Sequence, residues 1–335
     1  MSGGGGAGDR RVAVVVPNWN GARWLPGLLA SLDAQTRPPD AVVVVDNGSS
    51  DGSVAWLRDR RPDVDVVPLG RNTGFSVAAN QGIAVAAERH GAEAVALVNT
   101  DVELAPDWLA RTAARLAADD GVGAVATKMV LMGRPGVLDD AGDVLRRDGV
   151  AEQRGHGKPD GPRFDAPGEV FSACAGAALY RVDAVRRAGG FDERMFAYLE
   201  DVDLGLRLRL AGWRCAYEPA VALHARHGSS EGEEGERAID ALVVRHTLLL
   251  VAKAFPLRWL PLVAYRQLSW ARAAAREGRL AAHLRAVASA VPLLPRALLR
   301  DRPALHRTAV VPIDEAIPPR PWRGPRAGGH PDAPE

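Results

Sequence analysis

Residues 12–17 read Val-Ala-Val-Val-Val-Pro, and residues 41–46 read Ala-Val-Val-Val-Val-Asp. Each run is apolar almost throughout and closes on a polar or helix-breaking residue, the pattern of a strand buried on both faces of a parallel sheet. Leucines at helical spacing, at positions 25, 28, 29 and 32, separate the two runs. Parallel strands need a crossover connection, usually a helix, so this stretch predicts the first β-α-β unit of an α/β fold.

The same alternation continues for two more strands. The sequence predicts strands near 64–69 and over 94–98, with helices near 54–60 and 77–89. Ligands of such sheets bind beyond the carboxyl ends of the strands. We therefore expect the functional site at this edge, where the polar or turn-forming residues that close the strands are Pro17, Asp46, Asn72 and Asp101.

The second half of the chain is less regular. Pro106 and Asp107 are typical of the start of a helix, and the Gly-, Pro- and Asp-rich stretch 133–167 predicts a long loop or ribbon. Further elements are expected at 169–180 (apolar, extended), 183–188 (helix), 201–210 (helix) and 215–217 (a short last strand).

The composition changes after residue 230. Residues 231–236, Glu-Gly-Glu-Glu-Gly-Glu, are expected to form an acidic linker at the start of a basic helical extension over 231–311. Arg, Leu and Trp alternate within it, over 238–308. The Gly-rich segment 1–10 and the Pro-rich tail 312–335 are expected to be disordered.

The overall composition excludes several classes of protein. The chain has 335 residues, and its 42 basic and 41 acidic side chains leave a net charge of +1, which disfavours a nucleic-acid partner. Two cysteines are too few for a disulfide scaffold. No secretory signal is visible, and no apolar run reaches the roughly 20 residues of a membrane span. We expect a cytoplasmic protein, whose oligomeric state the sequence leaves open.

The two commonest nucleotide-binding loops are absent. The turn after the first strand reads Pro17-Asn-Trp-Asn-Gly, without the glycines of a dinucleotide site, and no Lys-Ser/Thr phosphate loop occurs. Carboxylates and amides remain at the strand ends. Asp46 could accept hydrogen bonds from a nucleoside, and Asp101 in Asn99-Thr-Asp101 suits a hard divalent cation. The alternative for Asp101 is a capping role in a strand-to-helix turn.

A second acidic cluster reads Tyr198-Leu-Glu-Asp-Val-Asp203. Interaction with a helix dipole and an Asp203–Arg207 pair would explain Asp203. The adjacent Glu200 and Asp201 follow an aromatic-rich segment, and a carboxylate placed there could remove a proton from an acceptor hydroxyl. His224 and His227, past the expected strand, are either ordinary histidines or candidate metal ligands.

These segments together resemble glycosyltransferase family 2, and most closely its bacterial rhamnosyltransferase-type members. The resemblance rests on five segments in order over about 11–230. They are VVVPNWNG, VVDNGSSDGS, RNTGFSVAANQG, LVNTDVELAPDW and GGFDERMFAYLEDVDLGLRLRLAGW, which begin at residues 14, 44, 71, 97 and 189.

The resemblance implies a GT-A fold, a Rossmann-like α/β architecture with a mostly parallel sheet flanked by helices, here carrying a C-terminal helical extension. Residues 11–130 would form the nucleotide-sugar half and 131–230 the acceptor half. The reaction would be sugar transfer with inversion, from a nucleotide-sugar donor to a glycan or lipid-linked acceptor in cell-surface polysaccharide synthesis. A divalent cation, Mg²⁺ or Mn²⁺, would assist it. A dTDP-rhamnose donor is suggested by the likeness alone.

Residue roles carry over from the family motifs. Asp201, with Glu200 beside it, would act as general base, and Asp101 would bind the metal together with His224 or His227. Asn99 stands where the family has the first Asp of its metal motif, which removes one anionic ligand. The residues expected along the donor are Pro17, Asn18, Asn20, Asp46, Asn47, Asn72, Asn80 and Asn99.

The sequence leaves two alternative functions open, and the C-terminal region has two interpretations. A nucleotidyltransferase would share the parallel strands and acidic ligands but should carry a Gly-rich basic loop after the first strand, which is missing. A catalytically silent sugar-binding subunit would retain the same pocket. The region 238–308 either packs as ordinary helices against the catalytic domain or binds the anionic inner face of the cell membrane, near a lipid-linked acceptor.

Overall fold

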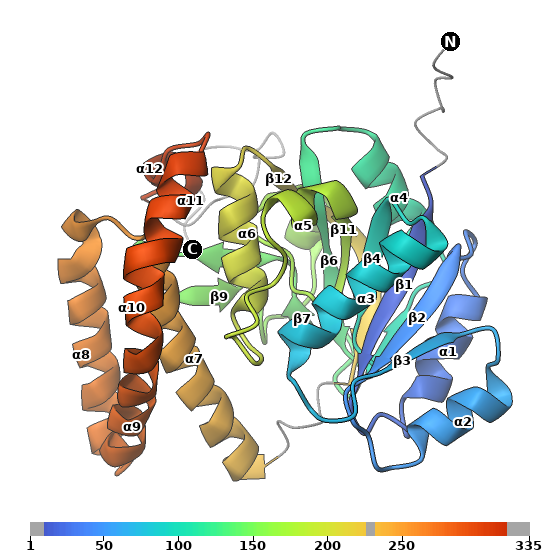
Figure 1. Ribbon diagram of the computed structural model, residues 1–335, viewed down its shortest axis with the longest axis horizontal. Coiled ribbons are helices and arrows are strands. Elements are labelled where there is room, and N and C mark those ends of the chain that lie inside the picture. The colour runs from blue at the N-terminus through green and yellow to red at the C-terminus, as the bar shows by residue number, and fades with distance from the viewer. Residues whose placement is uncertain (1–9, 226–231, 320–335) are drawn as a thin grey trace.

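The computed structural model describes residues 10–225 and 232–319, so the disorder expected for 1–9 and 320–335 lies outside the described residues. Strands and helices alternate in its first half, which confirms the predicted α/β class (Figure 1). The strands of the main sheet are β1 (Val12–Asn18), β2 (Ala41–Asp46), β3 (Asp65–Pro68), β4 (Ala94–Val98), β5 (Val102–Leu104), β6 (Val122–Leu131), β7 (Leu138–Asp140), β10 (Gly168–Val170), β11 (Ala177–Arg181) and β12 (Arg214–His224).

The main sheet runs in the order β10-β12-β6-β11-β4-β1-β2-β3, with β5 beside β12 and β7 beside β6. β1 pairs in parallel with β2 and β4, and β2 with β3. β11 is antiparallel to both neighbours, whereas β12 runs parallel to β6. The carboxyl ends of β1, β2 and β4 therefore meet at one edge, as the sequence predicted.

Helices cover both faces of this sheet and bury the β-branched runs completely, since Val14, Val15 and Val16 expose none of their surface. Gly82, in α3 (Phe75–His90), allows this helix to approach β1 closely, because a Cβ there would lie 2.2 Å from Val15 Cγ1. The helices of this part are α1 (Leu25–Asp33), α2 (Ser53–Arg60), α3 (Phe75–His90), α4 (Trp108–Ala117), α5 (Val182–Arg187) and α6 (Glu200–Leu210).

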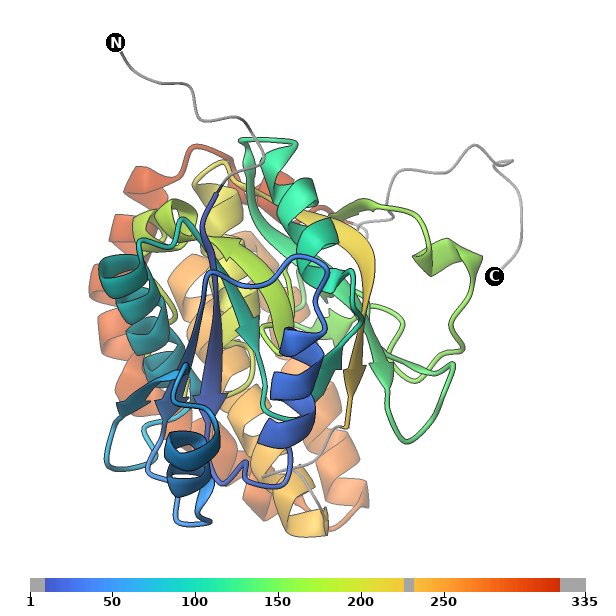
Figure 2. The same cartoon turned by 90° about the vertical axis from the view of Figure 1, so that its right-hand side faces the viewer.

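The expected ribbon at 133–167 contains short strands. β8 (Asp143–Leu145) and β9 (Ala151–Gln153) form a small antiparallel sheet, and a 3-10 turn follows at Pro162–Phe164. Figure 2 shows this green segment extending from one side of the main sheet. β7 adds the ribbon to the sheet by pairing with β6, which brings Asp140 opposite Met129.

The C-terminal helices gather on one side of the molecule, against α6 (Figure 1). A separate apolar core joins them to α6, whose Val202, Leu206 and Leu210 pack with Leu249 and Phe255. Beyond short 3-10 and π turns, the helices are α7 (Gly232–Ala254), α8 (Leu260–Arg276), α9 (Leu280–Ala290), α10 (Leu294–Arg296), α11 (Arg302–Thr308) and α12 (Ile313–Ala316).

Three expectations for the chain's ends and linker need correction. The acidic stretch expected to be a linker enters α7 from Gly232, because Glu is a good helix former and favours a helix N-terminus. The tail expected to be disordered from 312 is ordered through residue 319, since Ile317 is fully buried in the C-terminal core. Arg10, also expected to be disordered, pairs with Asp120.

Candidate functional site

The ends of β1 and β2 form a fixed polar corner. Asn18 and Asp46 are the last residues of these strands and lie opposite each other in register. Asn18 donates from Nδ2 to Asp46 Oδ1 at 2.9 Å, and the second Asp46 oxygen accepts the N–H groups of Gly48 and Ser49 at 3.2 Å each. Asn18 Oδ1 is buried without a hydrogen-bond partner among the described residues. The corner therefore holds an oriented carboxylate beside a carbonyl oxygen that can accept a further bond.

Three of the predicted donor-site amides shape the loops around this corner. Asn20 adopts a positive φ of 54° and accepts the Ser50 N–H at Oδ1. Asn47 binds the Thr73 N–H and the Gly74 carbonyl, which ties the turn after β2 to the turn before α3. Asn72 accepts the Gly74 N–H at 3.0 Å. Pro17 lies half-buried one residue before Asn18.

Asn80 lies elsewhere, on α3. Its side chain donates to the Phe191 carbonyl and accepts the Phe191 N–H, at 2.9 and 2.8 Å. It lines a cavity of about 460 Å³ together with Arg194, Lys253 and residues of the C-terminal helices. These contacts give Asn80 a role in bracing the loop before α6, and its predicted place beside a nucleoside stays a prediction.

The end of β4 places Asp101 beside His224. β5 and β12 pair antiparallel, with His224 opposite Val102, so the side chains of Asp101 and His224 meet, with Oδ2 3.3 Å from Nε2. The other ring nitrogen, Nδ1, lies 2.7 Å from Asp139 Oδ2. Burial opposes protonation of the ring, but the hydrogen bonds to Asp101 and Asp139 raise the pKa of His224 to about 9.

Two details of this region differ from expectation. His224 is the last residue of β12, an 11-residue strand, and does not follow a short one. The short strand expected from the sequence ends before Pro219. In the structure β12 has a register shift relative to β6 between Glu218 and Val221, which accommodates the proline, and the strand then continues to His224. His227 lies outside the described residues.

Asp101 and His224 fit part of a divalent cation site. No three His, Cys, Asp or Glu side chains are arranged to hold a metal within residues 10–225 and 232–319. Mg²⁺ and Mn²⁺ nevertheless bind through one or two carboxylates while substrate phosphates and water complete the shell. Histidine ligands commonly have the second nitrogen bonded to a carboxylate, the place that Asp139 occupies here. The donor set therefore suits a cation that arrives with a diphosphate and displaces a proton from His224 on binding.

The second acidic cluster starts α6. Tyr198 and Leu199 have positive φ angles of 70° and 66°, and Glu200 is the first residue of the helix. Asp201 is half-buried and accepts the N–H groups of Val202 and Ala175, at 2.8 and 3.2 Å. Burial raises its pKa above the usual aspartate value, although these N–H groups oppose the rise. Glu200 is buried, and its pKa is raised well above normal by burial and by the charge of Asp201.

The segment before β11 makes backbone contacts with both regions. The Gly176 carbonyl accepts the Asn99 N–H at 2.9 Å, and the N–H of the preceding residue, Ala175, donates to Asp201 Oδ2 at 3.2 Å. Asp201 and the half-buried Asn99 are thus anchored to adjacent backbone groups of the segment before β11. That the carboxylates at the end of β4 and at the start of α6 share a site stays a prediction.

Sequence reasoning missed three further buried acids of this region, Asp139, Asp140 and Asp143. Asp139 and Asp140 lie in β7. Burial raises the pKa of Asp140 to about 8, and the charges of Asp139 and Asp201 add to the rise, whereas the hydrogen bond from the Gly142 N–H opposes it. Burial and the charge of Asp201 likewise raise the pKa of Asp143 well above normal. The only local signal was an Asp-Asp pair before Ala-Gly in a segment expected to be a loop.

A family model described as glycosyl transferase family 2 matches residues 13–189, more than half of the chain. The chain belongs to glycosyl transferase family 2. The match spans the polar corner and the Asn99-Thr-Asp101 turn, and it ends just before the segment that carries Glu200 and Asp201. The chain is therefore a glycosyltransferase that uses nucleotide-sugar donors.

The curated relatives of this glycosyltransferase include a protein named as a rhamnosyltransferase and an O-antigen biosynthesis protein. An N-acetylglucosaminyl-diphospho-decaprenol L-rhamnosyltransferase of Mycobacterium tuberculosis is 32% identical over 249 residues, which are 66% of this chain and 78% of that protein. An O-antigen biosynthesis protein of Myxococcus xanthus is 30% identical over 70% of this chain but only 18% of its own length.

Solved structures place the glycosyltransferase in the GT-A fold. Staphylococcus aureus TarS 1–349 in complex with UDP-GlcNAc has a TM-score of 0.56 at 20% identity, over 91% of this chain and 89% of that one. A mannosyltransferase of Pyrobaculum calidifontis with GDP-Man and Mn²⁺ has a TM-score of 0.52 at 22% identity, over 91% and 82% of the two chains. At these low identities the structural similarity shows the fold alone, and this fold is the predicted GT-A architecture.

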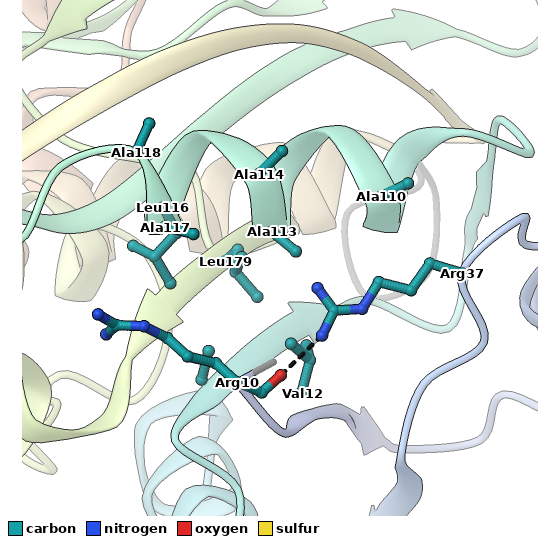
Figure 3. A pocket seen from close by; sticks show the side chains of 11 residues that line it. Arg10, Val12, Arg37, Ala110, Ala113, Ala114, Leu116, Ala117, Ala118 and Leu179 are labelled. Atoms are coloured by element: carbon teal, nitrogen blue, oxygen red, sulfur yellow. Dashed lines mark hydrogen bonds between the residues drawn. The ribbon is translucent and has the colours of Figure 1, made fainter. Parts of the chain in front are cut away.

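A second hollow of the glycosyltransferase is distinct from the site. It has a volume of about 400 Å³ and lies between α4 and the first residues of β1 and β4, Val12 and Ala94. Figure 3 shows alanines of α4 along one wall and two arginines opposite, with Arg37 donating to the Arg10 carbonyl. Because it opens at the amino ends of the strands, it lies on the side away from the polar corner and Asp101.

Proposed function

We propose that this glycosyltransferase transfers L-rhamnose or a related sugar from a nucleoside diphosphate to a hydroxyl of a glycan or lipid-linked acceptor, with inversion, in cell-surface polysaccharide synthesis. The contact between Asp101 and His224, together with the carboxylate of Asp201 at the start of α6, supports the proposal. The contact offers a place for a diphosphate-bound cation, and Asp201 offers a carboxylate for proton removal.

The proposed reaction is a single displacement. Asp201 accepts the proton of the acceptor hydroxyl while the acceptor oxygen bonds to the anomeric carbon. The bond from that carbon to the phosphate oxygen breaks, and the nucleoside diphosphate leaves with the bonding electrons. A divalent cation held by Asp101 and His224 would neutralise the charge on the leaving diphosphate. No protonated acid is needed, in contrast to the two-carboxyl mechanism of glycosidases.

Asp139 and Asp46 have supporting parts in this proposal. Asp139 holds Nδ1 of His224, which turns Nε2 toward Asp101. Asp46, fixed by Asn18 and two backbone N–H groups, accepts hydrogen bonds from the nucleoside. Asn20, Asn47 and Asn72 keep the surrounding loops in shape.

The donor identity can be tested by thermal unfolding of the whole chain with a panel of nucleotide sugars and Mn²⁺. A donor at about one hundred times its Kd stabilises the folded state by roughly 2.7 kcal/mol, which raises the Tm by several degrees. We expect dTDP-L-rhamnose to give the largest rise. A larger rise with UDP-GlcNAc or GDP-mannose would contradict the choice of sugar while leaving the reaction class intact.

We further propose that the protein contacts the inner face of the cell membrane through α8. No helix of the described parts has the length and apolar character to cross a bilayer. α8 instead lies at the outer edge of the molecule, far from β3 (Figure 1). Residues at three- to four-residue spacing leave a mixed apolar and basic face exposed, made of Leu262, Tyr265, Leu268, Arg272 and Arg276. Such a face suits an anionic lipid surface.

Charge reversal tests this contact. In the variant Arg272→Glu/Arg276→Glu, binding to phosphatidylglycerol-containing vesicles should fall at least about thirtyfold, because each basic residue near the surface contributes about 1 kcal/mol. Sedimentation with vesicles measures it. The control Arg58→Glu/Arg60→Glu makes the same charge change on α2, away from α8. Equal pelleting of the two variants would count against the α8 surface.

A further inference from the structure

The segment that leads into the proposed base has an unusual backbone. Tyr198 and Leu199 are consecutive non-glycine residues with left-handed φ angles, and they directly precede Glu200. Side chains with a Cβ disfavour this region, so neighbouring structure must hold the pair in place. The Leu199 carbonyl in turn accepts the Asp203 N–H at 2.9 Å and so defines where α6 begins. The position of Asp201 depends on this turn.

A residue of the C-terminal extension holds the turn. His246, on α7, is completely buried, and its Nδ1 lies 2.8 Å from the Tyr198 carbonyl. A carbonyl oxygen can only accept, so Nδ1 carries the proton and donates. Burial lowers the pKa of His246 to about 4, against the effect of this bond, so the ring is neutral near pH 7. Nε2 is buried without a partner among the described residues.

A second contact lies two turns along the same helix. Lys253 follows His246 by seven residues and therefore shares its face of α7. Its ammonium lies 2.5 Å from Asp203 Oδ1 and 2.8 Å from Asp192 Oδ2, and all three side chains are almost fully buried. Asp203 also pairs with Arg207 one turn on. One face of α7 thus fixes the segment 192–203 at its start, at its left-handed turn and within the first turns of α6.

We infer that His246 is a positioning residue for sugar transfer: it donates to the Tyr198 carbonyl, stabilises the left-handed turn and so sets the orientation of Asp201 toward the acceptor. The inference rests on the proposed role of Asp201. It gives the C-terminal helices a part in the reaction, since His246 belongs to the extension and not to the sheet that binds the donor.

Three variants of the full-length chain test it. His246→Ala removes the donor to Tyr198. His246→Asn restores an N–H near the position of Nδ1. Thr247→Val is the control, because Thr247 is the next residue, is equally buried, and has a hydroxyl without a partner among the described residues. The readouts are hydrogen exchange of peptides covering 196–204 and steady-state transfer from dTDP-L-rhamnose.

We expect His246→Ala to speed exchange over 196–204 and to lower kcat by about a hundredfold, as a misplaced catalytic group does, while the donor KM changes by less than about twofold. His246→Asn should recover most of both losses, and Thr247→Val should resemble the unmodified chain. Unchanged exchange in His246→Ala, or equal losses in Thr247→Val, would overturn the inference.

The exchange result separates this inference from the proposed function. Faster exchange over 196–204 with unchanged kcat would show that the turn is held by His246 but does not govern transfer, which would overturn the positioning role alone. Full activity of Asp201→Asn would instead overturn the role of Asp201 itself, and the inference with it.

Discussion

Asp201→Asn is expected to lower sugar transfer by at least about a hundredfold, because positioned general bases contribute roughly that much or more. The amide cannot take the acceptor proton. Donor binding should remain, since the carboxylate of Asp201 accepts two backbone N–H groups and the proposed cation ligands are Asp101 and His224. Transfer is measured by release of nucleoside diphosphate, and donor binding by calorimetry.

The matched control is Asp183→Asn, which removes an exposed acid paired with Arg187 on α5. It should leave transfer unchanged. The substitution Asp201→Asn weakens the two hydrogen bonds from backbone N–H groups, but it also removes one negative charge from a group of neighbouring buried acids. We therefore expect thermal unfolding to show no loss of stability beyond that of the weakened hydrogen bonds. Normal turnover of Asp201→Asn would remove this residue from the proposed mechanism.

The pH dependence of transfer should carry the same signature. Asp201 must be deprotonated to accept a proton, and burial raises its pKa despite the opposing N–H bonds. The rate should therefore rise with pH through an acid limb that lies above the usual range of an aspartate. An acid limb at the ordinary aspartate value would argue that another group limits the rate.

Asp101→Ala is expected to weaken Mn²⁺-dependent donor binding by about a hundredfold or more. Loss of groups that merely support metal ligands costs ten- to hundredfold in affinity, and Asp101 would be a ligand itself. Calorimetry with dTDP-L-rhamnose, with and without Mn²⁺, measures the effect. The variant should bind equally weakly in both conditions, while the unmodified chain should bind far more tightly with Mn²⁺.

The control for this experiment is Asp107→Ala, which removes an exposed acid at the start of α4 that is paired with Arg111 one turn on. It should preserve the Mn²⁺ effect. If the unmodified chain binds the donor with the same affinity with and without Mn²⁺, the assignment of Asp101 and His224 to a cation fails. His224→Ala should reproduce the loss seen with Asp101→Ala.

The fold and half of the site could be predicted from the sequence. The runs at 12–17, 41–46 and 94–98 are apolar almost throughout, and only a buried parallel sheet accommodates such strands together with intervening helices. Since parallel strands end at one edge, the closeness of Asp46 and Asp101 to that edge followed directly. The Glu200-Asp201 pair was equally visible, at the start of a helix with a regular apolar stripe.

The partners of His224 could not be predicted, because they depend on contacts between distant segments. Asp139 reaches His224 only through the pairing of β7 with β6, and this pairing has a register shift. The length of β12 was also hidden. Pro219 and the polar Glu218 interrupt its pattern, whereas the strand continues through an irregularity to His224. Local patterns carry no information on either feature.

The C-terminal helices posed a different difficulty. Their Arg- and Leu-rich composition predicted helices but not which side faces the rest of the chain. His246 was one of three adjacent polar residues, Arg245, His246 and Thr247, within an otherwise apolar run, and nothing nearby indicated Tyr198 as its partner. Ile317 lies between Pro312 and the pair Pro318-Pro319, so burial of that residue was not expected. Tertiary packing decided both.

The ionic contact of Lys253 limits how this protein can be recombined with its relatives. A chimera that joins this sheet to the C-terminal helices of another family member must supply a cation in register with Asp192 and Asp203. Without it, Asp192 and Asp203 would keep Arg194 and Arg207 but lose the buried cation that they share, and breaking a buried ion pair costs up to roughly 3–5 kcal/mol. Exchange of these helices is therefore expected to succeed only between chains that share this lysine and its two acidic partners.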